Sequence, residues 1–155
     1  MFIITNTIRP RTWPALIPLL AAGFVIYIDQ KEPENLSWVA YAMIAMAVVI
    51  WIILLKIQIT IDDISLTHQN LFRTRQIEWK DVTATYIKYR SHGQSGSYYW
   101  FFENVQGQKF RFSISLYGRS ALRQLAEAVV GKCGRAEIDT RITNMATGDF
   151  PWYIF

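Results

Sequence analysis

The stretch WIILLKIQITIDDISLTHQ, residues 51–69, decides the fold because two different patterns meet inside it. It begins as an unbroken apolar run, which suits a helix surrounded by lipid. From Lys56 onward apolar and polar residues alternate, with isoleucine at every second place in 57–61. A period of two is typical of a strand with one buried face. The sequence therefore predicts an apolar helix that passes into a β-strand almost without a linker.

The second half of this stretch predicts a β-hairpin. Asp62 and Asp63 interrupt the alternation, and such residues favour turns. Alternation resumes in residues 64–69, where we expect Ile64 and Leu66 to point inward. Adjacent carboxylates on a turn point apart, so we interpret the pair as turn-forming and not as a catalytic acid and base.

Two segments without charged residues, 13–28 and 38–55, make the N-terminal part of the chain a candidate membrane anchor. We call them the first and second window. Hydrophobic residues make up 52% of the 155 residues and charged residues 18%. A spanning helix needs about 17–25 apolar residues. We predict a transmembrane hairpin over residues 1–55, with spans at about 13–29 and 37–55. The alternatives are a buried core helix and, for the first window, a cleaved signal peptide.

Charges beside these windows predict the orientation. Arg9 and Arg11 precede the first window, and the segment between the windows is acidic. Residues 56–155 carry thirteen Lys and Arg against nine Asp and Glu. The positive-inside rule then places both termini in the cytoplasm. We expect Trp13 and Trp38 to act as membrane-interface anchors.

Small residues in both windows predict how the two helices pack. In membranes, small side chains let helix backbones approach closely. We expect the contact to form through Ala22, Gly23, Ala42 and Ala45.

Residues 56–134 predict a small α+β domain after the hairpin. Four further strands are expected near 71–79, 82–90, 97–104 and 109–114. Leu122, Leu125, Ala126, Val129 and Val130 then recur at helical spacing. The predicted fold class is a membrane α-helical hairpin plus an α+β domain, an antiparallel sheet or barrel capped by a C-terminal amphipathic helix.

This layout resembles the bacterial PH-like (pleckstrin-homology-like) membrane proteins. The resemblance rests on the two apolar windows, the strand order and an I-x-W-x-D-V segment formed by Ile77, Trp79, Asp81 and Val82. It covers about residues 56–132 and implies a PH-like fold more strongly than a function. It also implies a multi-pass protein of the bacterial inner (plasma) membrane. Many PH-like domains bind proteins instead of lipids.

Alternating basic residues are the candidate ligand contacts of the domain. Those that we expect to meet anionic lipid head groups are Arg73, Arg75, Lys88, Arg90 and Arg111. The alternative is that these charges only line an exposed sheet face and set the topology. Nucleic-acid binding is not expected, because the nearby aromatic residues suit a sheet core better than base stacking.

The C-terminal residues 135–155 form a tail outside the resemblance. We expect an edge strand in AEIDTRI, residues 136–142. The closing FPWYIF is strongly apolar, and we expect Trp152 and Tyr153 to lie at the membrane interface. Burial of these aromatics on their own domain, or docking on a partner, is the alternative.

No arrangement of catalytic or metal-ligating residues stands out in the sequence. Cys133 is the single cysteine, and His68 and His92 lack a zinc-ligand pattern. We therefore expect no cofactor, no metal and no enzymatic activity. Two functions remain: an accessory or scaffold protein that binds a membrane-protein partner or its own copies at the inner membrane surface, and a module that senses anionic lipid. An enzyme with an unrecognised site is a distant third.

Overall fold

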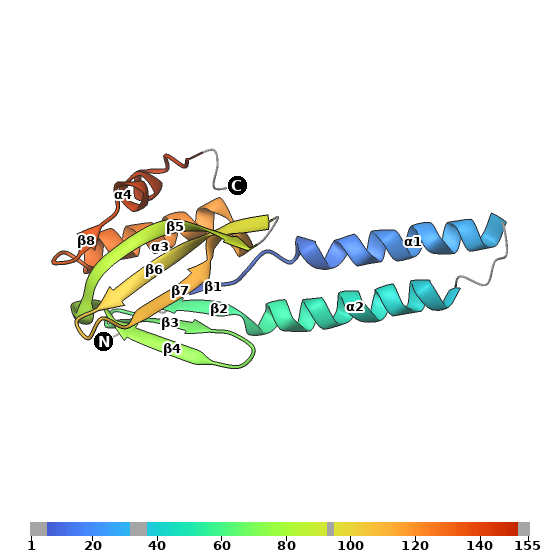
Figure 1. Cartoon of the computed structure of the whole chain (residues 1–155), viewed down its shortest axis with the longest axis horizontal. Coiled ribbons are helices and arrows are strands. Elements are labelled where there is room, and N and C mark those ends of the chain that lie inside the picture. The colour runs from blue at the N-terminus through green and yellow to red at the C-terminus, as the bar shows by residue number, and fades with distance from the viewer. Residues whose placement is uncertain (1–5, 32–36, 93–94, 152–155) are drawn as a thin grey trace. The chain divides into compact units, whose positions relative to one another are not determined.

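The structure is a computed structural model that describes residues 6–31, 37–92 and 95–151 of the chain (Figure 1). Its helices are α1 (Leu16–Lys31), α2 (Ser37–Lys56), α3 (Arg119–Lys132) and α4 (Thr140–Thr147). Its strands are β1 (Asn6–Ile8), β2 (Gln58–Ile61), β3 (Ser65–Gln69), β4 (Thr74–Glu78), β5 (Val82–His92), β6 (Ser95–Asn104), β7 (Lys109–Ser113) and β8 (Glu137–Ile138). The elements form two units, a helix pair in residues 10–57 and a sheet domain that combines β1 with the chain from Gln58 onward.

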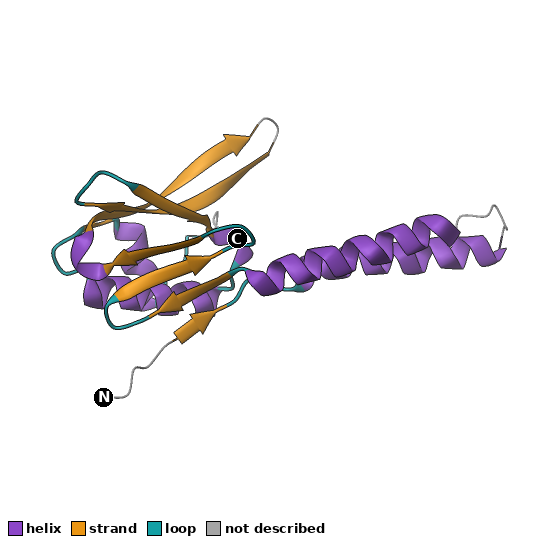
Figure 2. Ribbon diagram, turned by 90° about the horizontal axis from the view of Figure 1, so that it is seen from below, coloured by secondary structure: helices purple, strands orange, loops and turns teal. Residues whose placement is uncertain are grey.

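The helix pair consists of α1 and α2, which lie side by side (Figure 2). A 3-10 turn, Trp13–Ala15, precedes α1, so that Pro18 falls in the first turn of the α-helix. A proline is tolerated there because the first amide groups of a helix have no partner within the helix. Pro18 is therefore accommodated at the start of α1 and does not interrupt it.

Small residues at a spacing of seven form the contact between the two helices. Ala15 and Ala22 on one side, and Ala40 and Ala47 on the other, are each at most 5% exposed. Leu54 continues the same spacing on α2 and is also buried. A spacing of seven keeps side chains on one face of two helices that coil around each other. Alanine at these places lets the backbones approach closely.

This contact corrects the predicted packing face. Ala22 lies in the contact, but Ala42 and Ala45 are exposed, and a Cβ added to Gly23 would meet open space. Two residues along a helix correspond to a turn of about 200°, so Ala42 and Ala45 point away from the face of Ala40 and Ala47. The prediction was right about the kind of residue and wrong about Gly23, Ala42 and Ala45.

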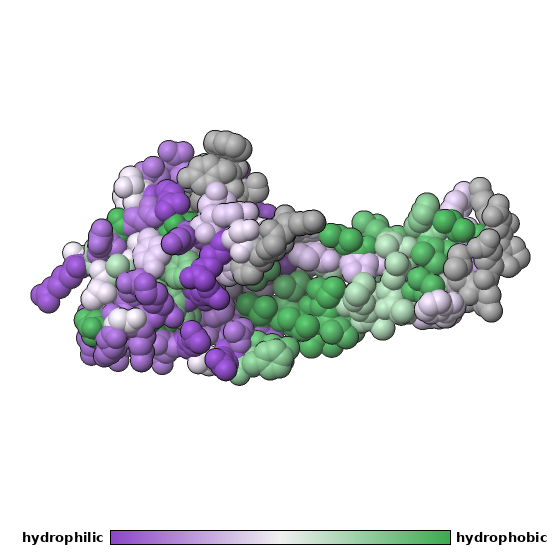
Figure 3. Space-filling view, in the orientation of Figure 1, coloured by the Kyte–Doolittle hydropathy of each residue, from purple (hydrophilic) through white to green (hydrophobic). Residues whose placement is uncertain are grey.

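The outward faces of both helices are apolar and exposed. In each of the two windows long and apolar enough to cross a membrane, Trp13–Gln30 and Trp38–Lys56, only 17% of the residues are buried. Figure 3 shows this apolar surface along the helix pair. Helices in the core of a soluble protein would be mostly buried. The structure therefore does not support the alternative that these are core helices.

Two four-stranded sheets form the sheet domain. The first has the order β1-β2-β3-β4 and is antiparallel throughout. The second has the order β7-β6-β5-β8, in which only β8 runs parallel to its neighbour. β2 to β7 confirm the six strands expected from the alternation. The sequence pattern does not predict β1, because three residues are too few to show a period.

One inward position was predicted wrongly. Ile64 is 71% exposed, whereas Ser65, Leu66 and His68 are buried. The Asp62 amide donates to the Ser65 carbonyl at 2.9 Å, so the turn includes Ile64 and the strand starts one residue later than expected.

The core lies between the inner faces of the two sheets and α3. Trp100 and Phe102 of β6 are fully buried and stack with ring centroids 5.8 Å apart. The Trp100 indole nitrogen donates to Thr85 Oγ1 at 2.7 Å, which satisfies the polar atom of a buried ring. The predicted stripe on α3 is buried in Leu122, Leu125, Ala126 and Val129, while Val130 is 38% exposed.

The acidic turn is tied to the I-x-W-x-D-V segment and to the end of α3. Trp79 Nε1 donates to the Asp62 carbonyl at 2.8 Å. Lys132 Nζ donates to the same carbonyl at 2.8 Å and to Asp63 Oδ1 at 3.0 Å. Asp63 therefore forms an ion pair from a turn, which agrees with the turn-forming interpretation.

The residues after α3, as far as Phe150, pack on the domain and do not form a separate tail. Of the edge strand expected in 136–142, only β8 forms, and the chain then turns into α4. Ile142 and Met145 of α4 are fully buried, and Phe150 packs against the core. The prediction missed α4, although Asp139 caps its start and Gly148, with φ of 93°, ends it. Trp152 and Tyr153 lie outside the described residues.

Asp139 and Arg141 complete the hydrogen bonds of β5 where β8 ends. The Ile87 amide donates to Asp139 Oδ2 at 3.2 Å, and Arg141 Nη2 donates to the Ile87 carbonyl. The two side chains also form an ion pair at 2.6 Å. Burial opposes ionisation of Asp139, but the hydrogen bonds from Arg141 and Ile87 outweigh it and lower the pKa of Asp139.

We predict that Ala22→Leu destabilises the helix pair by about 1–3 kcal/mol, because the larger side chain overfills a close contact. Gly23→Leu is the matched control, since its side chain would enter open space. Thermal unfolding of the full chain in detergent, followed by circular dichroism, measures both. Equal effects of the two variants would contradict the observed contact face.

We predict that Asp139 stabilises the domain at neutral pH and that this contribution is lost as the pH falls below about 4. The sign follows from its lowered pKa, because the unfolded chain binds the proton first as the solution is acidified. Asp139→Asn should cost about 1–3 kcal/mol at pH 7 and little at pH 3. Urea unfolding at both pH values measures the difference, with the exposed Asp149→Asn as control. A cost for Asp139→Asn that does not change with pH would contradict this.

Candidate binding surfaces of the sheet domain

The outer face of the second sheet carries three of the five basic residues predicted as ligand contacts. Lys88 and Arg90 lie on β5, and Arg111 lies on β7. Their neighbours Ile87, Phe110 and Phe112 point into the core, so by alternation these three cations point outward. The strand register pairs Lys88 with Tyr99 and Arg111 with Phe101 across β6. The sheet thus brings together cations that are up to 23 positions apart in sequence.

Aromatic rings hold the two arginines of this face in place. The Arg90 guanidinium lies 5.4 Å from the centre of the Phe101 ring, and that of Arg111 lies 5.4 Å from the Tyr99 ring. Tyr86 stacks on Phe101 with ring centroids 5.2 Å apart. Phe101 is only 2% exposed although it belongs to the outer face. Such cation–π contacts stabilise the pair by about 0.5–1 kcal/mol at exposed sites.

One carboxylate on this face is already paired. Lys109 Nζ lies 2.5 Å from Glu103 Oε1, and the Tyr86 hydroxyl donates to the same oxygen at 2.6 Å. The hydrogen bond from Lys109 lowers the pKa of Glu103, and the bond to Glu103 raises the pKa of Lys109. Both groups therefore stay charged at neutral pH. Glu137 of β8 pairs with Ala84 and so belongs to the same face. Among the described residues, the face therefore carries four cations, Lys88, Arg90, Lys109 and Arg111, against two carboxylates, and it is net positive.

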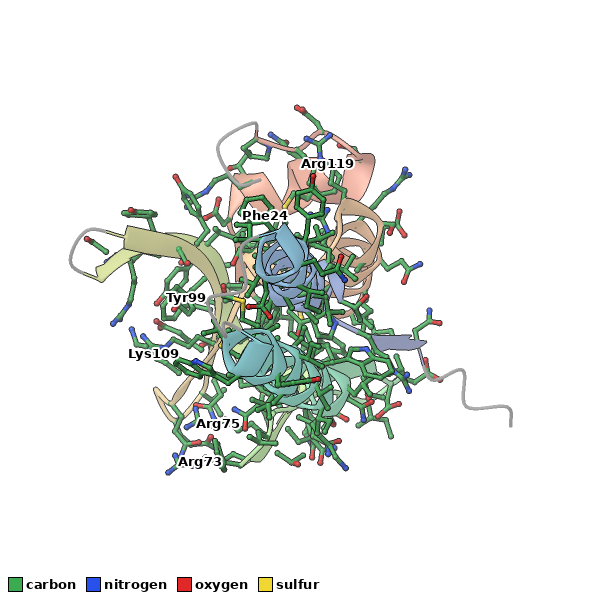
Figure 4. The ribbon with its side chains drawn as sticks, turned by 90° about the vertical axis from the view of Figure 1, so that its right-hand side faces the viewer. Phe24, Arg73, Arg75, Tyr99, Lys109 and Arg119 are labelled. Carbon is green, nitrogen blue, oxygen red and sulfur yellow. The ribbon has the colours of Figure 1, made fainter. Side chains whose placement is uncertain are left out.

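Arg73 and Arg75 belong to a different place, beside the open edge of the first sheet. Arg75 lies on β4, which ends that sheet as β7 ends the other. A groove of about 520 Å³ runs between these two edge strands. Its lining residues are Arg75, Gln76, Ile77, Asn104, Gln108, Lys109 and Phe110. Figure 4 shows Arg73, Arg75, Lys109 and Tyr99 along one side of the domain.

His68 lies behind this groove, opposite Arg75 in the register of β3 and β4. It is 8% exposed, and its ring lies 5.5 Å from that of Phe110 and 5.7 Å from that of Phe112. Burial, and secondly the charge of Arg75, lower the pKa of His68. His68 is therefore neutral at physiological pH.

Of the five predicted cations, three thus lie on the outer sheet face, Arg75 lines the groove, and Arg73 lies in the connection before β4, outside the groove lining. Sequence analysis missed Tyr99 and Phe101 as members of these surfaces, whereas the alternation in 109–113 already predicts that Lys109 points outward. The sequence shows no alternation around Tyr99 and Phe101, because residues 98–102 are all aromatic and do not distinguish the two faces of the strand. Of the predicted interface anchors, Trp13 and Trp38 are exposed at 53% and 69%.

Reactive side chains do not gather in the part of the chain that the structure describes. No group of three or more His, Cys, Asp or Glu that could hold a metal occurs among residues 6–31, 37–92 and 95–151. Cys133 is 2% exposed, and burial raises the pKa of its thiol to about 11. The surfaces described above therefore offer charge, aromatic rings and strand edges, which are means of binding.

We predict that Arg75→Gln raises the pKa of His68, because a nearby positive charge opposes protonation of the imidazole. The pKa should remain below 6.5, since burial also lowers it. Titration of the imidazole by NMR measures the shift. Arg73→Gln is the control and should change it less. A His68 pKa that falls or stays constant in Arg75→Gln would contradict the assignment.

A scan of protein-family models, a search of curated proteins and a search of solved structures each gave no match to this chain.

Proposed function

We propose that this chain is a non-enzymatic, membrane-anchored interaction module whose PH-like domain binds a partner protein at the cytoplasmic surface of the inner membrane. The observation that carries the proposal is the pairing of β1 with β2, which flank the helix pair. The chain leaves the sheet domain after Ile8, forms two apolar helices and returns to the same sheet at Gln58. A segment with this connectivity must cross the bilayer an even number of times.

Helix length and surface chemistry support two crossings. The two windows have 18 and 19 residues, which correspond to about 27–29 Å of helix at 1.5 Å per residue. The hydrocarbon core of a bilayer is about 30 Å thick. Water would meet Leu20, Phe24 and Tyr41, which are 76%, 64% and 71% exposed, if the helices were in solution. Lipid removes this cost.

The strand order supports a PH-like domain. β1 to β4 form one antiparallel sheet, β5 to β7 continue into a second, and α3 packs its apolar stripe against the core. The antiparallel strands and the C-terminal amphipathic helix agree with the expectation from the resemblance, which did not include a strand before the helix pair. β8 and α4 then extend the second sheet and the core.

Short connections keep the domain near the bilayer. Only Ile57 separates α2 from β2. On the other side, residues 9–12 connect β1 to the turn before α1. A four-residue connection spans at most about 14 Å. With the basic flanks inside, the domain would work at the cytoplasmic membrane surface, where membrane proteins and anionic lipids are its nearest possible partners.

A second candidate function, binding of anionic lipid, is favoured by the outer face of the second sheet. Arg90 and Arg111 lie against aromatic rings there, and Lys88 shares the face, without a matching number of acids among the described residues. Lipid binding should weaken as salt rises, because exposed charges are screened. Binding of a protein partner should persist and give a defined stoichiometry.

We predict that Asn35→Cys, between the two helices, reacts with a membrane-impermeant thiol reagent in intact cells, whereas Gln106→Cys, in the turn between β6 and β7, does not. The native Cys133 is buried and gives little background. Permeabilised cells are the control and should label both. The opposite pattern in intact cells would show that the orientation is wrong, and labelling of both would show that the chain does not span the membrane.

Purification of the tagged full chain in mild detergent tests the partner. Mass spectrometry should find a membrane protein, or additional copies of this chain, in fixed stoichiometry at both low and high salt. Recovery of anionic lipid alone, lost at high salt, would favour the second candidate.

A further inference from the structure

The groove between β4 and β7 is bounded by two strand edges that lack a neighbouring strand in the described part of the chain. β4 ends the first sheet and β7 ends the second. On the other side of the second sheet, β8 covers part of β5, and Asp139 with Arg141 completes the hydrogen bonds of Ile87. β5 is thus covered only between Ala84 and Ile87. No other strand in the described part of the chain pairs with the outer edge of β7.

The two faces of β7 differ in chemistry, so they would favour different side chains on the two faces of a strand added to it. Lys109 and Arg111 point to the outer face, and Phe110 and Phe112 point to the core. A neighbouring strand places its side chains alternately on the same two faces. Acidic residues on the outer face would meet Lys109 and Arg111, and apolar residues on the inner face would lie along Phe110 and Ile77 at the floor of the groove.

Arg75 adds charge from the opposite wall. It lines the groove together with Lys109, and no carboxylate is among the lining residues that the structure describes. Glu103 touches Lys109 from the outer face, so Lys109 is partly neutralised, whereas Arg111 contacts the Tyr99 ring. Charged residues also protect natural edge strands against aggregation, and this is the competing explanation for Lys109 and Arg111.

We infer that the β7 edge binds an extended partner segment of alternating acidic and apolar residues, which adds to the second sheet as a further strand. The inference rests on the proposed function and names the chemistry of the partner. Main-chain hydrogen bonds to β7 supply affinity, and the alternation of side chains supplies selectivity. Charge complementarity with Lys109, Arg111 and Arg75 selects acidic residues over basic ones.

Fluorescence anisotropy tests this with the full chain in phosphatidylcholine nanodiscs and a labelled peptide of sequence Thr-Glu-Val-Glu-Val-Glu-Thr. The same residues in block order, Thr-Glu-Glu-Glu-Val-Val-Thr, have the same charge but no alternation. A backbone N-methylated form of the alternating peptide keeps the charge and loses amide donors. We expect the alternating peptide to bind at least about tenfold more tightly than either control.

Two double variants separate the edge from the general charge of the face. Lys109→Gln with Arg111→Gln should weaken binding about tenfold. Lys88→Gln with Arg90→Gln removes the same charge from the same face, but from β5, two strands away from the β7 edge. It should change the affinity less than about twofold. Binding should also slow hydrogen exchange of β7 amides, which a purely electrostatic contact would not do.

The inference is overturned if the alternating peptide fails to bind, if the N-methylated peptide binds equally well, or if both double variants weaken binding alike. The last outcome would assign the face to nonspecific anion attraction. A partner that co-purifies equally with the wild type and with Lys109→Gln/Arg111→Gln would leave the proposed function standing and overturn the β7 site. Slowed exchange together with loss of binding only in the β7 variant supports it.

Discussion

The pairing of β1 with β2 is the constraint on which the rest of the structure depends. Ile8 and Ile59 are direct partners in the register, and both are buried. This pairing closes a loop of about fifty residues, and closing a flexible loop of that length would carry a substantial entropic cost. The two packed helices reduce it, because α1 and α2 return the chain to its starting point in a defined geometry. The strand pair thus makes the helix pair an insertion in the domain and requires its two ends to meet.

The sheet domain uses its surfaces unequally. The inner faces bury Trp100, Phe102 and their neighbours, and the outer face of the second sheet carries cations supported by aromatic rings. The two ends of that sheet differ as well. β8 and the Asp139–Arg141 pair cover β5 between Ala84 and Ile87, whereas no strand among the described residues pairs with the outer edge of β7. Among the described residues, the second sheet therefore presents one basic face and one strand edge that no other strand covers.

Much of the fold could be predicted, and the failures share a cause. Six strands and α3 follow from local periods, and turn residues such as Asp62 mark the breaks between them. The failures involve contacts between residues that are distant in sequence, or segments too short to show a period. Ala40 and Ala47 pack on α1, whereas Ala42 and Ala45, equally small, do not. α4 is short, and the burial of its Ile142 and Met145 depends on packing against the rest of the core, which includes α3. The five predicted cations are exposed, but strand register decides which of them share the outer sheet face and which lines the groove.

The sequence by itself determined the two apolar helices, the alternation of the strands and the outward direction of Lys109 and Arg111. Each of these is a local property, since a residue's face follows from its place in a period of 2 or 3.6. Only the tertiary structure decided that β1 joins β2, that Arg75 and Lys109 line one groove, and that β8 covers part of β5 while no described strand covers β7. These features arise from pairings between distant segments. Many alternative pairings satisfy the same local pattern, and only the packing of one shared core selects among them.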